Sequence, residues 1–177
     1  MGERRPIAWV SDKVEVVPHD GGRALVATAS IAAGERLIAL AHVFVDLPSK
    51  YTIQIQEHLH QAGTEEADDF MNHSCEPNVS IDFTTLEVTA LQPIDAGEQV
   101  TFNYNICEWD MREPFACVCG SEHCIGEIRG FRHLDGQQRQ RLLPWLSPYL
   151  RGRLAEGEGS EGEGKGKKAK AARMPAR

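Results

Sequence analysis

The sequence predicts a mostly β (α+β) fold, with helix confined to a short stretch near the C-terminal end. Apolar residues recur at every second position in short runs between turn residues, which is typical of half-buried strands. These runs are too short and too frequent for a parallel sheet with crossover helices. The chain has 177 residues, of which 41% are hydrophobic, so we expect one domain followed by a tail.

The first expected strands flank a turn at Asp20-Gly21-Gly22. Residues 14–17 precede this turn and residues 24–29 follow it, and both stretches are rich in Val, Leu and Ala. Gly34 offers another turn, and apolar residues then dominate positions 37–45, where we expect a further strand.

Three later segments show the same period of two. Residues 51–56 alternate apolar and polar side chains, which predicts a half-buried strand. Residues 79–83 and 86–90 alternate on either side of Thr84-Thr85, which predicts a hairpin. Val100, Phe102 and Tyr104 place one more apolar set on a single face.

The end of the chain changes character. Asp135 is a good N-cap for a helix over residues 137–143, which Pro144 would end. Residues 155–177 consist mainly of Gly, Glu, Lys and Ala. Because they offer little apolar surface to offset the entropy of ordering, we expect a disordered tail.

Charge divides between the tail and the rest of the chain. The net charge is −7, and the tail carries four Glu against six Lys and Arg, which leaves the remainder at −9. A main fold with this charge is poorly suited to bind nucleic acid phosphates and is better suited to a cationic peptide. An acidic surface can also serve solubility alone. We expect nucleic acid contact only weakly, through the tail.

The chain shows no sign of export or membrane insertion. No apolar run approaches the roughly 20 residues that a bilayer requires, and no apolar stretch follows the charged N-terminus as in a signal peptide. Five cysteines are an odd number, which favours metal binding or free thiols over a disulfide framework. We therefore expect an intracellular protein, in the cytoplasm or the nucleus.

A cysteine cluster is the first chemical signal. Cys117, Cys119 and Cys124 form a C-x-C-x4-C motif with Gly120 inside the loop. Thiolates at this spacing can converge on one tetrahedral Zn²⁺, and glycine lets the backbone turn tightly around the ion. Three reduced thiols without a metal are the alternative. On spacing alone the fourth ligand stays open among Cys75, Cys107, His123 and His133.

Two further segments are candidates for chemistry. Residues 72–78 read Asn-His-Ser-Cys-Glu-Pro-Asn, a dense set of hydrogen-bonding groups between apolar stretches. They could form a buried polar network or a ligand site. Residues 101–105 place Tyr104 on the same strand face as Phe102, where the two could form an ordinary core pair. The Tyr104 hydroxyl needs a partner if it is buried, and it could also orient a reacting group.

Together these segments resemble the SET domain of protein-lysine methyltransferases. Residues 72–78 resemble the NHSCxPN signature, residues 101–104 the strand that ends in the active-site tyrosine, and residues 117–124 the post-SET zinc motif. The stretch from Gly21 to Glu35 resembles the family's opening segment. Order and spacing agree over roughly residues 8–132. No cysteine-rich pre-SET segment precedes them, so the resemblance is to a minimal SET protein.

The resemblance implies a SET-type fold of small curved sheets with a threaded pseudoknot and a C-terminal zinc-binding segment. The implied organisation is a SET domain over 1–112, a post-SET zinc segment over 113–133, a short helical segment over 134–154 and a disordered tail over 155–177. It also implies a structural Zn²⁺ held by four thiolates. Those ligands would be Cys75, Cys117, Cys119 and Cys124.

The implied activity is transfer of a methyl group from S-adenosylmethionine to the lysine amine of a histone or another protein. Tyr104 would orient the amine, and Phe102 would leave space that favours higher methylation states. The implied cofactor-binding residues are Gly22, Arg23, Ala24, Tyr51, Asn72, His73, Tyr104 and Phe131. A narrow apolar channel would favour the neutral amine, since free lysine has a pKa near 10.4.

Three positions depart from the family pattern. Ala24 replaces the second glycine of the opening segment, Asn103 stands where Asp is common, and Asp69 stands where a basic residue is common. None removes the tyrosine or a zinc ligand, so an active enzyme is the favoured reading. The alternatives are a non-catalytic SET-fold binding module, for which Ala24 is the best support, and a small zinc-bearing nucleic-acid module, which the acidic body disfavours.

Overall fold

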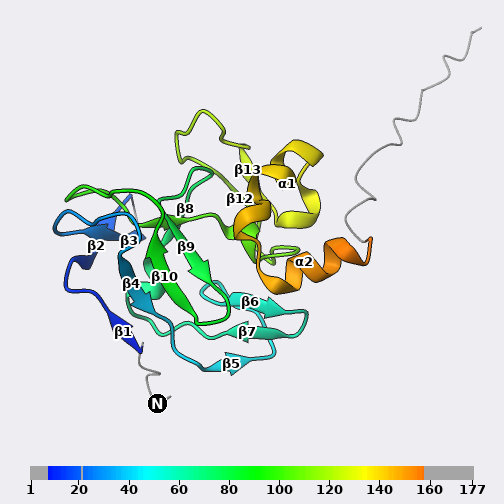
Figure 1. The fold of residues 1–177 in the computed structure, drawn as a ribbon, viewed down its shortest axis with the longest axis horizontal. Coiled ribbons are helices and arrows are strands. Elements are labelled where there is room, and N and C mark those ends of the chain that lie inside the picture. Colours follow the sequence, from blue (N-terminus) through cyan, green and yellow to red (C-terminus); the bar gives the residue numbers. More distant parts are fainter. Residues whose placement is uncertain (1–7, 21, 158–177) are drawn as a thin grey trace, which may run out of the picture.

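The computed structural model describes residues 8–20 and 22–157. The strands are β1 (Trp9–Val10), β2 (Val14–His19), β3 (Gly22–Ala27), β4 (Arg36–Ala39), β5 (Phe44–Val45), β6 (Ile53–Gln56), β7 (Leu59–Gln61), β8 (Asn72–His73), β9 (Val79–Asp82), β10 (Glu87–Ala90), β11 (Thr101–Phe102), β12 (Phe115–Ala116) and β13 (Glu127–Ile128). The 3₁₀ helices are η1 (Ala67–Phe70), η2 (Tyr104–Ile106), η3 (Phe131–His133) and η4 (Leu143–Trp145), and the α-helices are α1 (Gly136–Leu142) and α2 (Pro148–Ala155). The prediction of a mostly β fold with late helices is confirmed (Figure 1).

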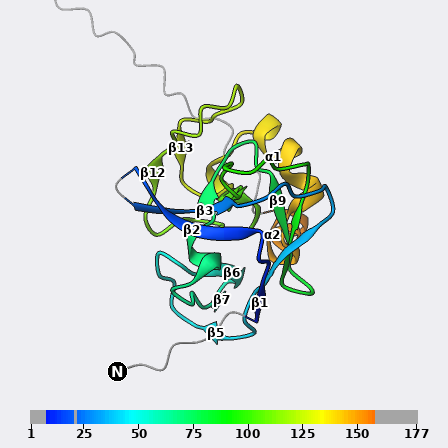
Figure 2. The ribbon, with the colours of Figure 1, turned by 90° about the vertical axis from the view of Figure 1, so that its left-hand side faces the viewer.

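The described strands form several small sheets. The largest has the order β1-β4-β10-β9, a second has the order β5-β7-β6, and three are strand pairs, β2-β3, β8-β11 and β12-β13. The expected hairpins are present, because β2 pairs antiparallel with β3 and β9 pairs antiparallel with β10. The β2-β3 hairpin crosses the molecule above the β5-β7-β6 sheet (Figure 2).

The prediction of one strand over residues 37–45 is wrong. This apolar run divides into β4, which joins the four-stranded sheet, and β5, which joins the three-stranded sheet. Leu37 and Ile38 of β4 are fully buried, whereas Phe44 of β5 is 40% exposed. A single apolar stretch thus serves two sheets, and its composition does not show where the chain passes from one to the other.

The strand expected over residues 51–56 is shorter, and its burial does not alternate as expected. Ile53 and Gln54 are both buried in β6. Gln54 tolerates burial because its polar groups have partners. Its backbone N–H donates to Glu108 Oε1, and its side-chain Oε1 accepts from the backbone N–H of Trp109, both at 2.9 Å. These bonds join β6 to residues far away in the sequence.

The two motif segments lie side by side as the parallel pair β8-β11. Asn72 pairs with Thr101, and His73 pairs with Phe102. Beyond the strands, the Ser74 N–H donates to the Phe102 carbonyl at 3.1 Å, and the Asn78 side chain bonds both the Gln99 carbonyl and the Thr101 N–H. This pairing brings the end of the tyrosine strand against the Asn-His segment.

The C-terminal end packs as two short helices. Asp135 caps α1 in a capping box with Gln138, which confirms the expected cap. Helix α2 follows, with Ser147 as its N-cap. The tail was expected from residue 155, but α2 includes that residue, and positions 158–177 lie outside the described residues. No described helix has the length and apolar character to cross a membrane.

Gly130 occupies a backbone position that a larger residue would strain. Its φ is +102°, and an added Cβ would lie 2.7 Å from the Trp109 carbonyl oxygen. We expect Gly130→Ala to lower the free energy of unfolding by about 3 kcal/mol or more, from left-handed strain plus the clash. Gly136→Ala is the matched control, because open space surrounds that glycine. Chemical denaturation of both variants checks this, and equal stabilities would contradict the prediction.

Candidate active site

A cavity of about 1260 Å³ runs between the ends of β3, η1, β8, β11 and the stretch from Cys107 to Cys119. A single-ligand pocket is typically about 300–1,000 Å³, so this space can hold a cofactor together with a substrate side chain. Its walls carry eight Asp and Glu residues against three Lys and Arg. The lining acids are Asp20, Asp46, Glu57, Asp68, Asp69, Glu108, Asp110 and Glu113. This charge favours a cationic ligand.

Tyr104 lines this cavity at the start of η2. Its hydroxyl donates to the Met71 carbonyl at 2.9 Å, and its ring packs against Phe102 with centroids 4.7 Å apart. Burial raises the pKa of Tyr104 well above its usual value, so the hydroxyl stays protonated at neutral pH. Phe102 is 6% exposed and also lines the cavity. The two residues predicted to be catalytic are therefore brought together.

His73 connects Tyr104 to the cysteine cluster. Its Nδ1 accepts the Tyr104 backbone N–H at 3.1 Å, and its Nε2 lies 3.5 Å from Cys75 Sγ. Burial lowers the pKa of His73 to about 4, so the ring is neutral at physiological pH. With Nδ1 accepting, the proton is assigned to Nε2, which then donates toward the cysteine sulfur. Both ring nitrogens are thereby engaged within the protein.

The other residues predicted to bind a cofactor lie on the cavity wall at several points. Asn72 Nδ2 donates to Gln99 Oε1 at 3.0 Å, and Gly22 and Arg23 line the cavity at the start of β3. The Arg23 guanidinium lies 3.8 Å from the centroid of the Phe70 ring, and Tyr51 meets Phe70 edge to face. Arg23 thus offers a positive charge beside aromatic surface in a mainly acidic cavity.

Two of the residues predicted to contact the cofactor do not line the cavity. Ala24 is fully buried in β3 and does not line the cavity, so its methyl group does not reach a ligand there. Phe131 is also fully buried, packed between Trp109 and Arg139, and does not line the cavity. Both residues belong to the core. The suggestion that Ala24 impairs cofactor binding, and with it the main support for a non-catalytic module, loses its structural basis.

The cysteine cluster is suited to a tetrahedral metal. The sulfur atoms of Cys75, Cys117, Cys119 and Cys124 all lie within 4.8 Å of one another, and those of Cys75 and Cys117 are 3.9 Å apart. A Zn–S bond of about 2.3 Å sets tetrahedral sulfurs about 3.8 Å apart. Gly120 has a φ of +71°, which lets the loop between the ligands turn back. The four thiolates fit Zn²⁺.

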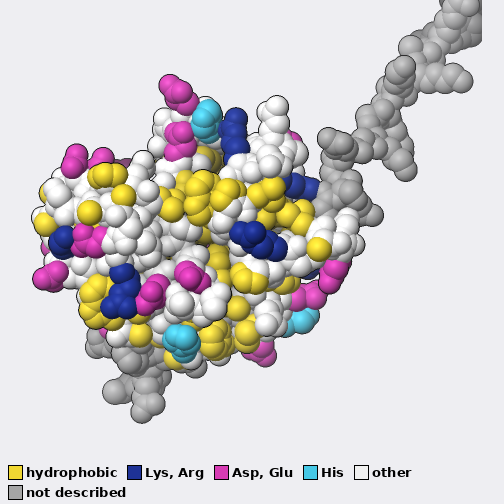
Figure 3. Space-filling model, in the orientation of Figure 1, with side chains coloured by type: hydrophobic (Ala, Val, Ile, Leu, Met, Phe, Trp, Pro, Cys, Tyr) yellow, Lys and Arg dark blue, Asp and Glu magenta, His cyan; other side chains and the backbone are white. Residues whose placement is uncertain are grey.

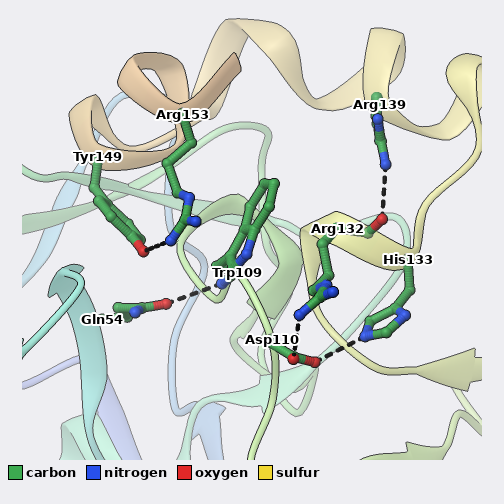
Figure 4. A network of polar contacts seen from close by, with 8 residues as sticks. All are labelled: Gln54, Trp109, Asp110, Arg132, His133, Arg139, Tyr149 and Arg153. Carbon is green, nitrogen blue, oxygen red and sulfur yellow. Dashed lines mark hydrogen bonds and ion pairs between the residues drawn. The ribbon is translucent and has the colours of Figure 1, made fainter. Parts of the chain in front are cut away.

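The three other candidates for the fourth ligand have different partners. Cys107 is buried in the core and donates to the Tyr104 carbonyl. His123 faces Glu76 at 3.7 Å, and His133 bonds Asp110 at 2.8 Å, as Figure 4 shows. Cys75 therefore completes the cluster.

Sequence reasoning missed two cavity residues. Phe115 in β12 packs edge to face against His73 and Tyr104, with both centroid distances at 5.9 Å. Glu108 lines the cavity four residues after Tyr104, and burial raises its pKa to about 7. Its position just after the tyrosine strand could have marked it, but only the structure shows that it faces the cavity.

Comparison with known proteins finds relatives among SET-domain methyltransferases. The family model described as SET domain matches residues 22–105, the region that contains β3, β8, β11 and Tyr104. Residues 22–105 are therefore similar to a SET domain. Methyltransferase flvH of Aspergillus flavus is 39% identical over 88 residues, which cover 49% of this chain and 48% of that protein. A histone-lysine N-methyltransferase of Yarrowia lipolytica, H3 lysine-36 specific, is 30% identical over 132 residues, which cover 62% of this chain and 17% of that protein.

A solved structure shares this fold. KRYPTONITE, in a complex with mCHH DNA, H3(1-15) peptide and SAH, is 25% identical, with a TM-score of 0.51. That match covers 64% of this chain and 29% of the KRYPTONITE chain. The chain thus spans about half or less of the length of these relatives. The parallel pair β8-β11 lies within the matched residues, whereas Cys117, Cys119 and Cys124 follow them in the chain.

Proposed function

We propose that the protein is a protein-lysine N-methyltransferase that uses S-adenosylmethionine. The observation that carries this proposal is the meeting of Tyr104, Phe102 and the Asn72–His73 strand at one cavity inside a SET domain. Relatives named methyltransferase and histone-lysine N-methyltransferase support it, as does the SAH in the KRYPTONITE structure.

The cavity residues suit the cofactor. S-adenosylmethionine, when bound, supplies a methyl group on a positively charged sulfur, which a neutral amine can attack. We assign cofactor contacts to Gly22, Arg23, Tyr51, Asn72 and His73, which share the cavity wall. Arg23 can pair with a carboxylate, and the acidic walls favour a cation. Since both ring nitrogens of His73 have protein partners, its contribution would come from its backbone and ring face.

Tyr104 and Phe102 act on the substrate amine in this proposal. The Met71 carbonyl fixes the hydroxyl of Tyr104, and the lone pairs of the phenolic oxygen stay available to orient an amine. Phe102 has no hydroxyl with which to hold a water beside the amine. We therefore expect products with more than one methyl group, which mass spectrometry of the product peptide would count.

The substrate is a lysine side chain of a histone or another protein. The acidic cavity suits a basic peptide, and the KRYPTONITE structure contains an H3 peptide. A histone substrate would place the protein inside the cell, with the nucleus the natural compartment. The cysteine cluster would hold a structural Zn²⁺ next to the cavity.

The test is transfer of a labelled methyl group from S-adenosylmethionine to mixed histones and to a whole-cell lysate. Label in a protein band, with release of S-adenosylhomocysteine, supports the proposal and identifies the substrate. Measurable binding of S-adenosylhomocysteine without label in any band would contradict it and favour a non-catalytic SET-fold binding module.

A further inference from the structure

Glu108 is a carboxylate on the cavity wall for which the proposed function so far has no task. It lies one turn beyond Tyr104, since its backbone N–H donates to the Tyr104 carbonyl at 3.0 Å. Its own carbonyl accepts the Phe131 N–H at 2.7 Å. These bonds hold the backbone of Glu108 next to the tyrosine.

The Glu108 side chain is held as firmly as its backbone. Its Oε1 accepts the backbone N–H of Gln54 at 2.9 Å, while the Gln54 side chain accepts the Trp109 N–H (Figure 4). One residue of β6 therefore fixes both Glu108 and its neighbour. A carboxylate has about four acceptor sites, and this single N–H bond leaves most of them open.

Neighbouring cations are directed to other partners. Arg132 and His133, from η3, both contact Asp110 at 2.8 Å, and Arg153, from α2, stacks over Trp109 and bonds the Tyr149 hydroxyl (Figure 4). Among the residues that the structure describes, none forms an ion pair with Glu108.

The titratable side chain in contact with the Glu108 carboxylate is neutral. Cys107 Sγ lies 3.9 Å from Oε1, and burial raises the pKa of this thiol well above its usual value. Tyr104 is likewise protonated, and β6 contributes only the Gln54 backbone. Glu57 and His58, from the turn after β6, line the same cavity at its wall. A cation that entered here would find Glu108 as an unpaired carboxylate.

A lysine ammonium must lose a proton before its nitrogen can attack a methyl group. We propose that the Glu108 carboxylate receives this proton from the substrate lysine. One ammonium N–H bond breaks, its electron pair stays on the nitrogen, and an O–H bond forms on Glu108, which later releases the proton to solvent. This inference rests on the proposed methyltransferase function. In this inference the negative charge of the Glu108 carboxylate attracts the ammonium, and the same carboxylate is the base that removes its proton.

The acid strength of Glu108 suits this task. Burial raises its pKa to about 7, close to the pH at which a general base works best. The carboxylate must be ionised to accept a proton, so kcat/KM for the peptide should rise with pH through about 7. We call this rise the ascending limb of the pH profile. Asp69, in the same cavity, has a pKa raised to about 6 by burial and the nearby charge of Asp68, so its ionisation is the competing explanation for an ascending limb.

The experiment compares pH profiles of methyl transfer to a substrate peptide for the native chain and three variants. Glu108→Gln keeps an oxygen for the Gln54 N–H but cannot take a proton. We expect kcat at pH 8 to fall about 100-fold and the limb near pH 7 to disappear. Glu108→Asp should keep a rise of the rate with pH, and Asp69→Asn should leave the native rise near pH 7 unchanged. Affinity for S-adenosylhomocysteine should change less than twofold in Glu108→Gln.

Thermal unfolding without cofactor gives an independent readout. The folded-state pKa of Glu108 lies above its usual 4.5, so the native chain loses stability as pH rises from about 4.5 to 7. Glu108→Gln escapes this loss. Its Tm should therefore exceed that of the native chain by a few degrees at pH 8 and match it near pH 4.5. A merely structural bridge to Gln54 would instead give a lower Tm at both values.

Three results would overturn the inference. One is an unchanged rate and pH limb in Glu108→Gln, another is loss of the limb in Asp69→Asn alone, and the third is a native profile that is flat from pH 6 to 8. If the native chain transferred no methyl group to any protein, the proposed function itself would fail, and the role of Glu108 would fall with it. The first three results require an active native chain, so the two failures are distinguishable.

Discussion

Tyr104→Phe is expected to lower the rate of methyl transfer by about 100-fold to 1,000-fold, the range seen when one preorganised polar group is removed from a reacting centre. The phenolic oxygen is the polar atom that Tyr104 presents at the cavity, and the Met71 carbonyl holds it in place at 2.9 Å. The ring contacts with Phe102, His73 and Phe115 are kept in the variant. Initial rates with saturating cofactor and peptide measure the effect.

A second tyrosine provides the control. Tyr149→Phe removes a hydroxyl that bonds Arg153, in α2 and outside the cavity (Figure 4). We expect it to keep the native rate. Tyr104→Phe should cost about 1 kcal/mol of stability, because the buried Met71 carbonyl loses its donor, but should still bind S-adenosylhomocysteine. A Tyr104→Phe variant with more than a third of the native rate would show that the hydroxyl has no part in the reaction.

Cys117→Ser is expected to abolish metal binding and to inactivate the protein. Structural zinc sites contribute about 10–16 kcal/mol in small zinc-finger peptides, which matches or exceeds the whole stability of a typical domain. Loss of the ion would release the loop that carries Cys119 and Cys124 and would leave Cys75 without its partners. Since His73 lies between Cys75 and the Tyr104 backbone, the effect should reach the tyrosine.

Elemental analysis of the purified chain should find one zinc ion per native molecule and none in Cys117→Ser. Cys107→Ser is the matched control, because it removes a thiol outside the cluster. It should keep one zinc ion even if packing at this buried position makes it less stable. A native chain purified without metal, or equal metal content in both variants, would refute the site.

Local patterns explain what the sequence predicted well. The alternation over residues 79–90 identified a hairpin, since neighbouring residues alone determine it. Asp135 and Gln138 identified the start of α1 for the same reason. The spacing of Cys117, Cys119 and Cys124 predicted three members of the cluster, but the fourth lies 42 residues away, and only the resemblance to a family pointed to Cys75.

Contacts between distant segments account for the errors. Gln54 reads as the polar face of a strand, yet it is buried because it bonds residues more than 50 positions later. The predicted contact of Phe131 with a cofactor stays a prediction, and the structure shows this residue buried against Trp109 and Arg139. Phe115 carries no local signal of a site, and the position of Glu108 just after the tyrosine strand does not show that it faces the cavity. Figure 3 shows hydrophobic side chains gathered in a band across one face of the surface. Because apolar residues also lie on the surface, an apolar residue in the sequence does not by itself identify the core or the site.

The parallel pair β8-β11 also has consequences for how the protein folds. Each strand has two residues and pairs only with the other, so neither has a local partner to stabilise it. The β9-β10 hairpin lies between them in the chain and can form first from nearby residues. Contacts between distant residues form slowly, because closing the intervening loop costs entropy before the contact repays it. We expect the chain to acquire its sheets early and its catalytic geometry last, so that amide hydrogen exchange reports protection in β9 and β10 before it does at Tyr104.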